Sequence, residues 1–140
     1  MGVSDLMSRK VASVEMDDQV GVVKAIFEQG YFHHLVVVED GKVVGMLTDR
    51  DLLKVLSPNL GTVRETEKDL SCLESKVHQI MSRDVITIQK QASVRHAIGL
   101  FYHNKVTCLP VVDDDQRLVG ILTWRDIFKA LAESQPGGAG

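Results

Sequence analysis

The chain has 140 residues, of which 44% are hydrophobic and 25% are charged, enough for one compact domain with a buried core. The net charge is −3 and no basic stripe is visible, which argues against nucleic-acid binding. No apolar run approaches the roughly 18 residues of a membrane span, and no hydrophobic signal peptide precedes the first element. We therefore expect a cytoplasmic protein that binds neither nucleic acid nor membrane.

The first half of the chain predicts alternating strands and helices. An extended segment at residues 11–14 is followed by a helix that Asp18 could cap. Its apolar stripe has near-helical spacing and comprises Val20, Val23, Ile26, Phe27 and Gly30. Residues 35–38 and 43–47 then read as a hairpin. The closing helix is apolar nearly all round, which predicts burial on more than one side; its apolar residues are Leu52, Leu53, Val55 and Leu56.

A polar connector follows at residues 57–79. Four apolar residues near its end are spaced for one face of a helix: Leu70, Leu73, Val77 and Ile80. Thr66 and Asp69 form a candidate capping box for that helix. A packed connector helix is the expected structure.

The second half repeats the same order. After an extended segment at residues 85–88, Ser93 could cap a helix whose apolar residues recur at helical spacing: Val94, Ala97, Ile98 and Phe101. Residues 109–112 and 118–122 predict a second hairpin. The second closing helix carries Ile127, Phe128 and Leu131, and we expect the tail at residues 133–140 to be disordered.

The two halves are copies of one unit. Residues 43–54, VVGMLTDRDLLK, return as residues 118–129, LVGILTWRDIFK, and Met-Ser-Arg at 7–9 returns at 81–83. One extra residue falls in the acidic turn, where length changes are tolerated. We predict an α+β (α/β) fold of two β-α-β-β-α repeats, residues 1–57 and 80–132, related by a pseudo-two-fold axis. Residues 58–79 form the connector, and the marginal size of each repeat predicts a shared core in one compact module.

Thr48-x-x-Asp51 and Thr123-x-x-Asp126 stand where a strand gives way to a helix. The pattern has a purely structural interpretation as a capping box, which stabilises a helix start by about 1 kcal/mol. It also suits a nucleotide, because free amides can meet a phosphate and a carboxylate can accept hydrogen bonds from ribose hydroxyls. Arg50 is either a solvated side chain or a phosphate ligand, as is Arg125 in the second copy. Both interpretations remain open.

No catalytic constellation is legible in the sequence. There is no Ser-His-Asp or Cys-His arrangement, no P-loop and no metal-ligand spacing among the histidines, so we expect neither an enzyme nor a metal site. Cys72 and Cys108 form no CxxC pair, and Cys108 on an apolar strand should be inert. His33 and His34 are either a phosphate-binding pair, stronger at low pH, or one buried and one exposed strand residue.

The duplicated (V/L)VG-hydrophobic-LTxRD motif, with LPVVD at residues 109–113, resembles the tandem CBS domain pair, or Bateman module, of stand-alone bacterial-type proteins, over about residues 6–131. The resemblance implies a regulatory module that binds AMP, ADP, ATP or S-adenosylmethionine in clefts between the repeats, requires no cofactor, forms homodimers and signals to a separate, unknown protein target. The alternative is a ligand-free dimerisation and protein-interaction scaffold with degenerate clefts.

The resemblance also implies two ligand-binding clefts, each with walls from both repeats. Cleft A would comprise Thr123, Arg125, Asp126, Val11, Ala12, His33, His34, Leu35 and Val36. Cleft B would comprise Thr48, Arg50, Asp51, Val85, Ile86, Thr107, Cys108, Leu109 and Pro110. The chain departs from the family pattern at Val36, where a proline is usual, and at Trp124, which replaces Asp49 of the first copy. Val36 retains a backbone N–H, and Trp124 could stack on a base or cover an apolar edge.

Overall fold

The computed structural model describes residues 1–30 and 32–134. Contacts within the chain divide them into two compact units, which we describe separately. Unit 1 contains residues 1–11 together with everything described from residue 86 onward, and unit 2 contains residues 12–85. Each unit therefore combines the body of one repeat with the leading segment of the other.

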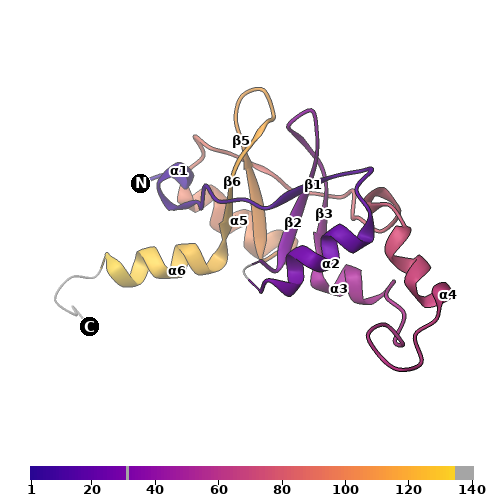
Figure 1. The fold of residues 1–140 in the computed structure, drawn as a ribbon. Helices are drawn as coiled ribbons and strands as arrows, with labels where there is room; N and C mark the ends of the chain where they lie inside the picture. Colours follow the sequence, from indigo (N-terminus) through magenta and orange to yellow (C-terminus); the bar gives the residue numbers. More distant parts are fainter. Residues whose placement is uncertain (31, 135–140) are drawn as a thin grey trace. The chain divides into compact units, whose positions relative to one another are not determined.

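Unit 2 is built on a three-stranded sheet in the order β1–β2–β3, comprising Ser13–Glu15, His34–Glu39 and Lys42–Thr48. β1 runs parallel to β2, and β2 pairs antiparallel with β3 through the turn at Asp40 and Gly41, both with positive φ. The helices α2 (Val20–Glu28) and α3 (Asp49–Leu53) lie together beside this sheet (Figure 1). The predicted β-α-β-β-α order is confirmed.

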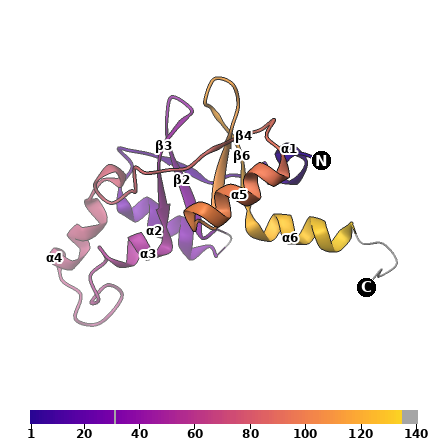
Figure 2. The same ribbon diagram turned by 180° about the vertical axis from the view of Figure 1, so that it is seen from behind.

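Unit 1 repeats that plan, with a sheet in the order β4–β5–β6 comprising Ile88–Gln89, Cys108–Val112 and Leu118–Thr123. β4 is parallel to β5, and β5 is antiparallel to β6. The helices α5 (Val94–Asn104) and α6 (Trp124–Glu133) contact each other, as Figure 2 shows in orange and yellow. The short α1 (Val3–Leu6) contacts both α6 and β6.

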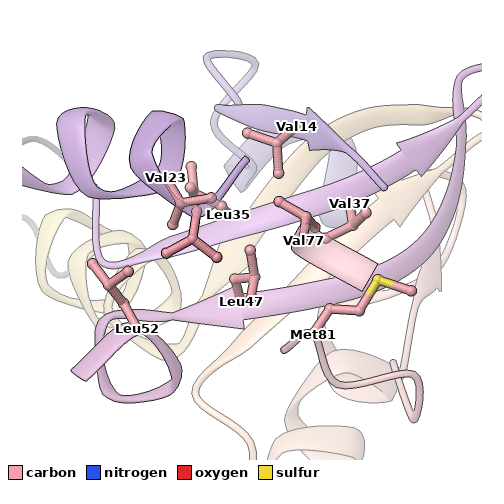
Figure 3. Packing of buried hydrophobic residues seen from close by; sticks show 9 residues of the cluster. Val14, Val23, Leu35, Val37, Leu47, Leu52, Val77 and Met81 are labelled. Carbon is pink, nitrogen blue, oxygen red and sulfur yellow. The ribbon is translucent and has the colours of Figure 1, made fainter. Parts of the chain in front are cut away.

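Buried side chains form two clusters, one in each unit, so the expectation of one shared core is corrected. In unit 2, Figure 3 shows Val23 of α2 and Leu52 of α3 against strand residues such as Leu35. Val77 and Met81, from the leading segment of the second repeat, complete this cluster. In unit 1, Val3 and Met7 of the first repeat do the same. Each repeat thus supplies part of the other repeat's core.

The duplicated Met-Ser pair joins each leading segment to the sheet of the other repeat through backbone hydrogen bonds. Ser8 and Ile121 of β6 exchange backbone hydrogen bonds of 2.8 and 2.9 Å, and Ser82 and Met46 of β3 exchange two bonds of 2.9 Å. The methionine before each serine crosses a strand glycine closely. A Cβ on Gly120 would lie 2.5 Å from the sulfur of Met7 and 2.9 Å from the Ser8 carbonyl oxygen. The glycine of the repeated motif is therefore required by close packing.

Several local expectations are corrected. Asp18 does not cap α2, because its Oδ2 accepts a hydrogen bond from the Glu15 amide and Gln19 is the N-cap residue. Gly30, with φ +78°, lies beyond the end of that helix. The first closing helix ends at Leu53, so Val55 and Leu56 lie outside it. Ser93 caps α5 as predicted, because its Oγ accepts a hydrogen bond from the His96 amide at 3.1 Å.

The connector is helical only in short pieces: α4 (Glu67–Leu70) and two 3-10 turns, η1 (Ser71–Glu74) and η2 (Val77–Gln79). Its predicted capping box is present, with the Thr66 amide donating to Asp69 Oδ2 at 2.8 Å. Of the predicted tail, Glu133 is the last residue of α6, and residues 135–140 lie outside the described residues.

Candidate functional site: the two strand-to-helix junctions

The two Thr-x-x-Asp motifs stand at the ends of β3 and β6. Thr48 is the N-cap residue of α3, and its amide donates to Asp51 Oδ2 at 2.9 Å while its Oγ1 accepts from the Asp51 amide at 3.2 Å. Thr123 and Asp126 make the same reciprocal pair, at 2.8 and 3.2 Å, at the start of α6. The capping-box interpretation is therefore confirmed for both motifs.

The capping hydrogen bond occupies only part of the acceptor capacity of the Asp51 and Asp126 carboxylates. Each aspartate accepts the threonine amide through Oδ2 alone, and a carboxylate offers about four lone-pair sites on its two oxygens. All four side chains are half-buried. The box at Thr66 and Asp69 has the same geometry in the connector, away from any strand end, so local geometry alone does not mark a binding site.

The first junction lies at a hollow of about 230 Å³. Its lining residues come from the start of β2 and the end of β3: His33, His34, Thr48, Asp49 and Arg50. His34 pairs with Thr48 across the two strands. The hollow therefore brings the two histidines beside the first Thr-x-x-Asp motif, within one repeat.

The two histidines differ in their surroundings. His33 is exposed, with Nδ1 3.9 Å from Asp49 Oδ2. His34 is half-buried, and its pKa is lowered from 6.5 first by burial and then by the neighbouring His33, while the charge of Asp49 opposes the shift. Of the expected buried and exposed pair, His33 is exposed as predicted, but His34 is only half-buried. Two imidazole rings and a guanidinium give this hollow hydrogen-bond donors suited to an anion.

The second junction is less polar. Cys108 pairs with Thr123 across β5 and β6, and it is buried. Burial, with a further contribution from the Asp126 charge, raises the pKa of the Cys108 thiol to about 12. The predicted inert thiol is confirmed. Trp124 packs edge-on against Phe128 with ring centroids 5.2 Å apart, so it covers an apolar edge.

The remaining predicted residues divide by burial. Leu35, Val36 and Leu109 are 0% exposed and Pro110 is buried. Leu35 and Leu109 belong to the two core clusters, whereas Val36 and Pro110 belong to neither. Four others at the strand starts are half-buried: Val11, Ala12, Val85 and Ile86. Thr107 is exposed and accepts the Trp124 amide through its carbonyl oxygen at 3.4 Å. Arg125 is exposed.

The structure groups some of these residues differently from the two predicted clefts. His33 and His34, predicted for cleft A, line one hollow with Thr48 and Arg50, predicted for cleft B. Each predicted cleft draws on both units, so its full composition stays a prediction. Asp49 was missed as a site residue. Its signal was its place directly after Thr48, where the second copy has tryptophan.

A further hollow of about 380 Å³ lies between α5 and α6 of unit 1. Its lining is apolar or aromatic throughout: Ile98, Phe101, Tyr102, Val106, Trp124, Ile127, Phe128 and Leu131. Several of these are about half exposed, including Phe128 at 58% and Leu131 at 52%. The prediction that the closing helix is apolar nearly all round is wrong for α6, which is amphipathic: Ile127 is buried, whereas Arg125 and Lys129 are exposed.

Two kinds of site are not found in the part of the chain that the structure describes. Residues 1–30 and 32–134 contain no group of three or more histidine, cysteine or acidic side chains placed to hold a metal ion. Within the same residues, no helix combines the length and apolarity needed to cross a bilayer.

Known proteins share this fold and sequence pattern. The chain is 32% identical over 126 residues to inosine-5'-monophosphate dehydrogenase of Methanocaldococcus jannaschii, covering 89% of this chain but only 22% of that protein. CBSX2, solved in complex with AMP, has a TM-score of 0.78 and 25% identity, covering 96% of this chain and 98% of that one. The CBS domain pair of protein MJ0100, solved with 5'-methylthioadenosine and S-adenosyl-L-methionine, has a TM-score of 0.75 and 27% identity, with coverage of 96% and 98%.

The match to an enzyme is thus confined to about a fifth of that enzyme's length. The family model described as the CBS domain matches twice, at residues 3–58 and 77–133, which together span most of the chain. With two matched repeats, two similar sheets and two capped Thr-x-x-Asp junctions, the chain belongs to the CBS domain family as a tandem pair.

Proposed function

We propose that this protein is a regulatory module that binds adenosine-containing nucleotides at its Thr-x-x-Asp junctions and signals to a separate protein. The supporting observation is the shared chemistry of the ligands in two related structures. CBSX2 was solved in complex with AMP, and the MJ0100 pair was solved in complex with 5'-methylthioadenosine and S-adenosyl-L-methionine. The adenosine group is common to all three compounds, so adenosine is the part of the ligand that we assign to this chain.

The junction residues suit an adenosine. Asp51 and Asp126 each keep lone pairs beyond the capping bond, which can accept hydrogen bonds from the two ribose hydroxyls. The hydroxyl oxygens of Thr48 and Thr123 accept the aspartate amides, so each hydroxyl proton can be donated to a ligand oxygen. Capping and ligand contact are therefore compatible roles of the same side chains.

A phosphate is favoured over a sulfonium at the first junction. The hollow there is lined by Arg50, His33 and His34, with one opposing carboxylate, Asp49. A guanidinium attracts phosphate oxygens and repels a cationic sulfonium, and imidazole N–H groups can donate hydrogen bonds to phosphate oxygens. We propose AMP, ADP or ATP as the regulatory ligand, in preference to S-adenosylmethionine. The walls of clefts A and B are those expected from the resemblance, except that we assign His33 and His34 to the first junction together with Arg50.

Calorimetric titration of the full chain with AMP, ADP, ATP and S-adenosylmethionine tests this function. In Asp51→Asn and Asp126→Asn variants, the amide oxygen can still cap the helix, but one acceptor oxygen becomes a donor. We expect at least a tenfold loss of AMP affinity from the double variant, because two charge-assisted hydrogen bonds are lost at each site. Asp69→Asn is the matched control, since it alters the third capping box without touching a junction.

Unchanged AMP affinity in the folded double variant would remove the ribose role of these aspartates. If the wild-type protein binds none of the four compounds, the second candidate function gains: a dimerisation and protein-interaction scaffold. The apolar hollow between α5 and α6 favours that candidate, because half-exposed aromatic side chains are typical of interaction surfaces.

We propose that this α5–α6 surface also joins two copies of the chain as a homodimer, and that the protein acts in the cytoplasm without catalysis of its own. Sedimentation analysis tests the dimer. Phe128→Asp should yield monomers, because a charge would be buried without a partner in the interface. Leu53→Asp, at an exposed apolar residue of the shorter closing helix, provides the comparison. A wild-type monomer at all concentrations would contradict the dimer.

A further inference from the structure

A second apolar hollow of unit 1 has no part in nucleotide binding as proposed above. It has a volume of about 230 Å³ and lies among α1, the start of α5 and the end of α6; we call it the α1–α6 hollow. All of its lining residues except the last are apolar: Met1, Leu6, Val94, Ile127, Ala130, Leu131 and Ser134. Val94 and Ala130 line this hollow and not the α5–α6 hollow, so the two can be tested separately.

The duplication identifies the corresponding surface of unit 2. Val94 corresponds to Val20 at an offset of 74 residues, and Leu131 corresponds to Leu56 at 75, beyond the extra turn residue. Val20 is 0% exposed, whereas Val94 is half-buried. Leu56 is half-buried, whereas Leu131 is 52% exposed. The same surface is therefore better covered in unit 2 than in unit 1.

The connector covers this surface in unit 2. Its turn η1 contacts α2, where a Cβ on Gly21 would lie 3.6 Å from the Cβ of Leu73. Nearby, Asp69 Oδ1 accepts a hydrogen bond of 2.6 Å from the hydroxyl of Ser57, beyond the end of α3. Residues 69–75 thus run from the closing segment to the start of α2. Unit 2 shows what kind of segment fits this surface: a short helical piece that presents a leucine.

The α1–α6 hollow can accept a similar segment. Gly21 corresponds to Arg95, and a Cβ at the glycine would lie 3.5 Å from the Leu73 carbonyl oxygen, which is an ordinary contact. The arginine therefore leaves room for the backbone of such a segment. Arg95 is exposed, and the first turn of α5 holds no acidic residue, so its charge and the helix N-terminus favour an acidic group beside the hollow.

We propose that the α1–α6 hollow binds a short amphipathic helical segment of a partner protein, with an apolar side chain in the place of Leu73 and an acidic residue beside Arg95. The inference rests on the proposed function in that this partner is the protein to which the module signals. The connector has the same pattern, since Glu74 follows Leu73. A volume of about 230 Å³ suits one or two side chains and is below the ~300–1,000 Å³ of typical small-molecule pockets.

A peptide of residues 66–76, TEKDLSCLESK, is the probe for the full chain under reducing conditions. The tethered connector competes for unit 2 at a high effective concentration, so the added peptide should bind unit 1. We expect saturable binding with a Kd of roughly 0.1–1 mM, as for a small interface, and NMR shift changes at residues 94 and 130. The same peptide with Leu73→Asp should bind at least fivefold more weakly, because a charge would enter an apolar hollow.

Variants of the full chain locate the site. Ala130→Asp should weaken peptide binding at least tenfold, because it places a charge in the α1–α6 hollow alone. Phe128→Asp is the matched control on the same helix: it alters the α5–α6 hollow and should leave peptide binding unchanged. Arg95→Glu should weaken binding about threefold, the magnitude of a surface ion pair, and decides the matter if Ala130→Asp does not fold.

The outcomes separate this inference from the proposed function. Saturable AMP binding without peptide binding at about 2 mM overturns the inference and leaves the function standing. Peptide binding without AMP binding contradicts the nucleotide function and leaves the hollow as a protein site. Unchanged peptide binding in folded Ala130→Asp, or shift changes at Gly21 in place of Val94, also overturns the inference. So does a wild-type dimer that Ala130→Asp dissociates and Phe128→Asp does not, because a second copy would then fill the hollow.

Discussion

The two units are built alike inside and differ at their surfaces. Both close their sheets with a Met-Ser pair from the other repeat, and both place a capped aspartate at the end of the last strand. Their closing helices differ, because α3 has 5 residues and α6 has 10. At the start of the second strand, unit 2 has a histidine pair where unit 1 has Thr107 and Cys108.

This contrast indicates which repeated residues are held by packing. Gly45 and Gly120 have no room for a side chain, so the fold itself requires them. Differences between the units occur in the core, where Val23 corresponds to Ala97, and also at exposed positions such as His33 and Trp124. The repeated glycines thus report on the scaffold, whereas the exposed differences are the ones available to a ligand.

Removing residues 1–8 should have the largest effect and should fall on unit 1. The deletion strips two core side chains, Val3 at 0% and Met7 at 9% exposure, and the paired bonds between Ser8 and Ile121. The loss should be about 5 kcal/mol, comparable with the whole stability of a small domain. Hydrogen exchange measured by mass spectrometry should show lost protection in β4–β6 and retained protection in β1–β3.

Equal loss of protection in both units would instead show that they unfold as one. Retained protection in unit 1 would contradict the part that we assign to the leading segment. Either result would contradict the view that each unit is an independent structure completed by a leading segment from the other repeat.

Gly120→Ala and Gly45→Ala should each destabilise the protein by about 2 kcal/mol, because the added Cβ would meet a methionine sulfur and a backbone carbonyl oxygen within 3.0 Å. The methionine can move, but the serine carbonyl is held by its strand bond. Gly99→Ala is the control, since a Cβ at this position within α5 meets nothing within 4 Å and should stabilise by about 1 kcal/mol. Urea unfolding measures all three variants, and equal stability of the Gly99 and Gly120 variants would contradict the packing argument.

Much of this fold could be predicted because its signals are local. The apolar spacing predicted α5, the acidic turns predicted both hairpins, and the three Thr-x-x-Asp patterns predicted three capping boxes. The repeat pointed to a duplicated fold. Leu52 and Leu53 correctly marked a helix, but the helix does not extend through Val55 and Leu56, since propensity alone does not set where the chain turns.

The rest depended on contacts between distant segments. Nothing local indicates that Met7 packs against the second repeat and Met81 against the first, so the sequence suggested one shared core. The same limit applies to the site. The histidine pair and Arg50 were identified individually, but their common hollow depends on the register of β2 with β3, which fixes His34 opposite Thr48.

Thr48→Ala and Thr123→Ala should each cost about 1 kcal/mol, the usual value of an N-cap side chain. Thr66→Ala should cost less, because its box caps a four-residue helix in the exposed connector. Thermal unfolding in the absence of ligand gives the comparison. A larger loss from Thr66→Ala than from Thr123→Ala would place the stability of the chain in the connector and contradict the scaffold role of the junctions.

The smallest expected effect is a pH dependence that arises from His34 of unit 2. Since the pKa of His34 is lowered from 6.5 in the folded protein, the unfolded chain binds the proton more readily. Stability from this group is therefore complete above about pH 6.5 and declines as the pH falls through the lower folded value. The equivalent residue in unit 1 is Cys108, and burial raises the pKa of its thiol to about 12.

Urea unfolding between pH 7.5 and pH 5 should show this decline in the wild type and a smaller one in His34→Asn. AMP binding should have the opposite trend, because a phosphate near His34 favours the protonated ring that the free protein disfavours. Adenosine, which lacks the phosphate, controls for the other groups of the hollow, His33, Asp49 and Arg50. If adenosine and AMP respond alike to pH, the histidine pair does not contact the phosphate, and the first junction loses the feature that distinguishes it from the second.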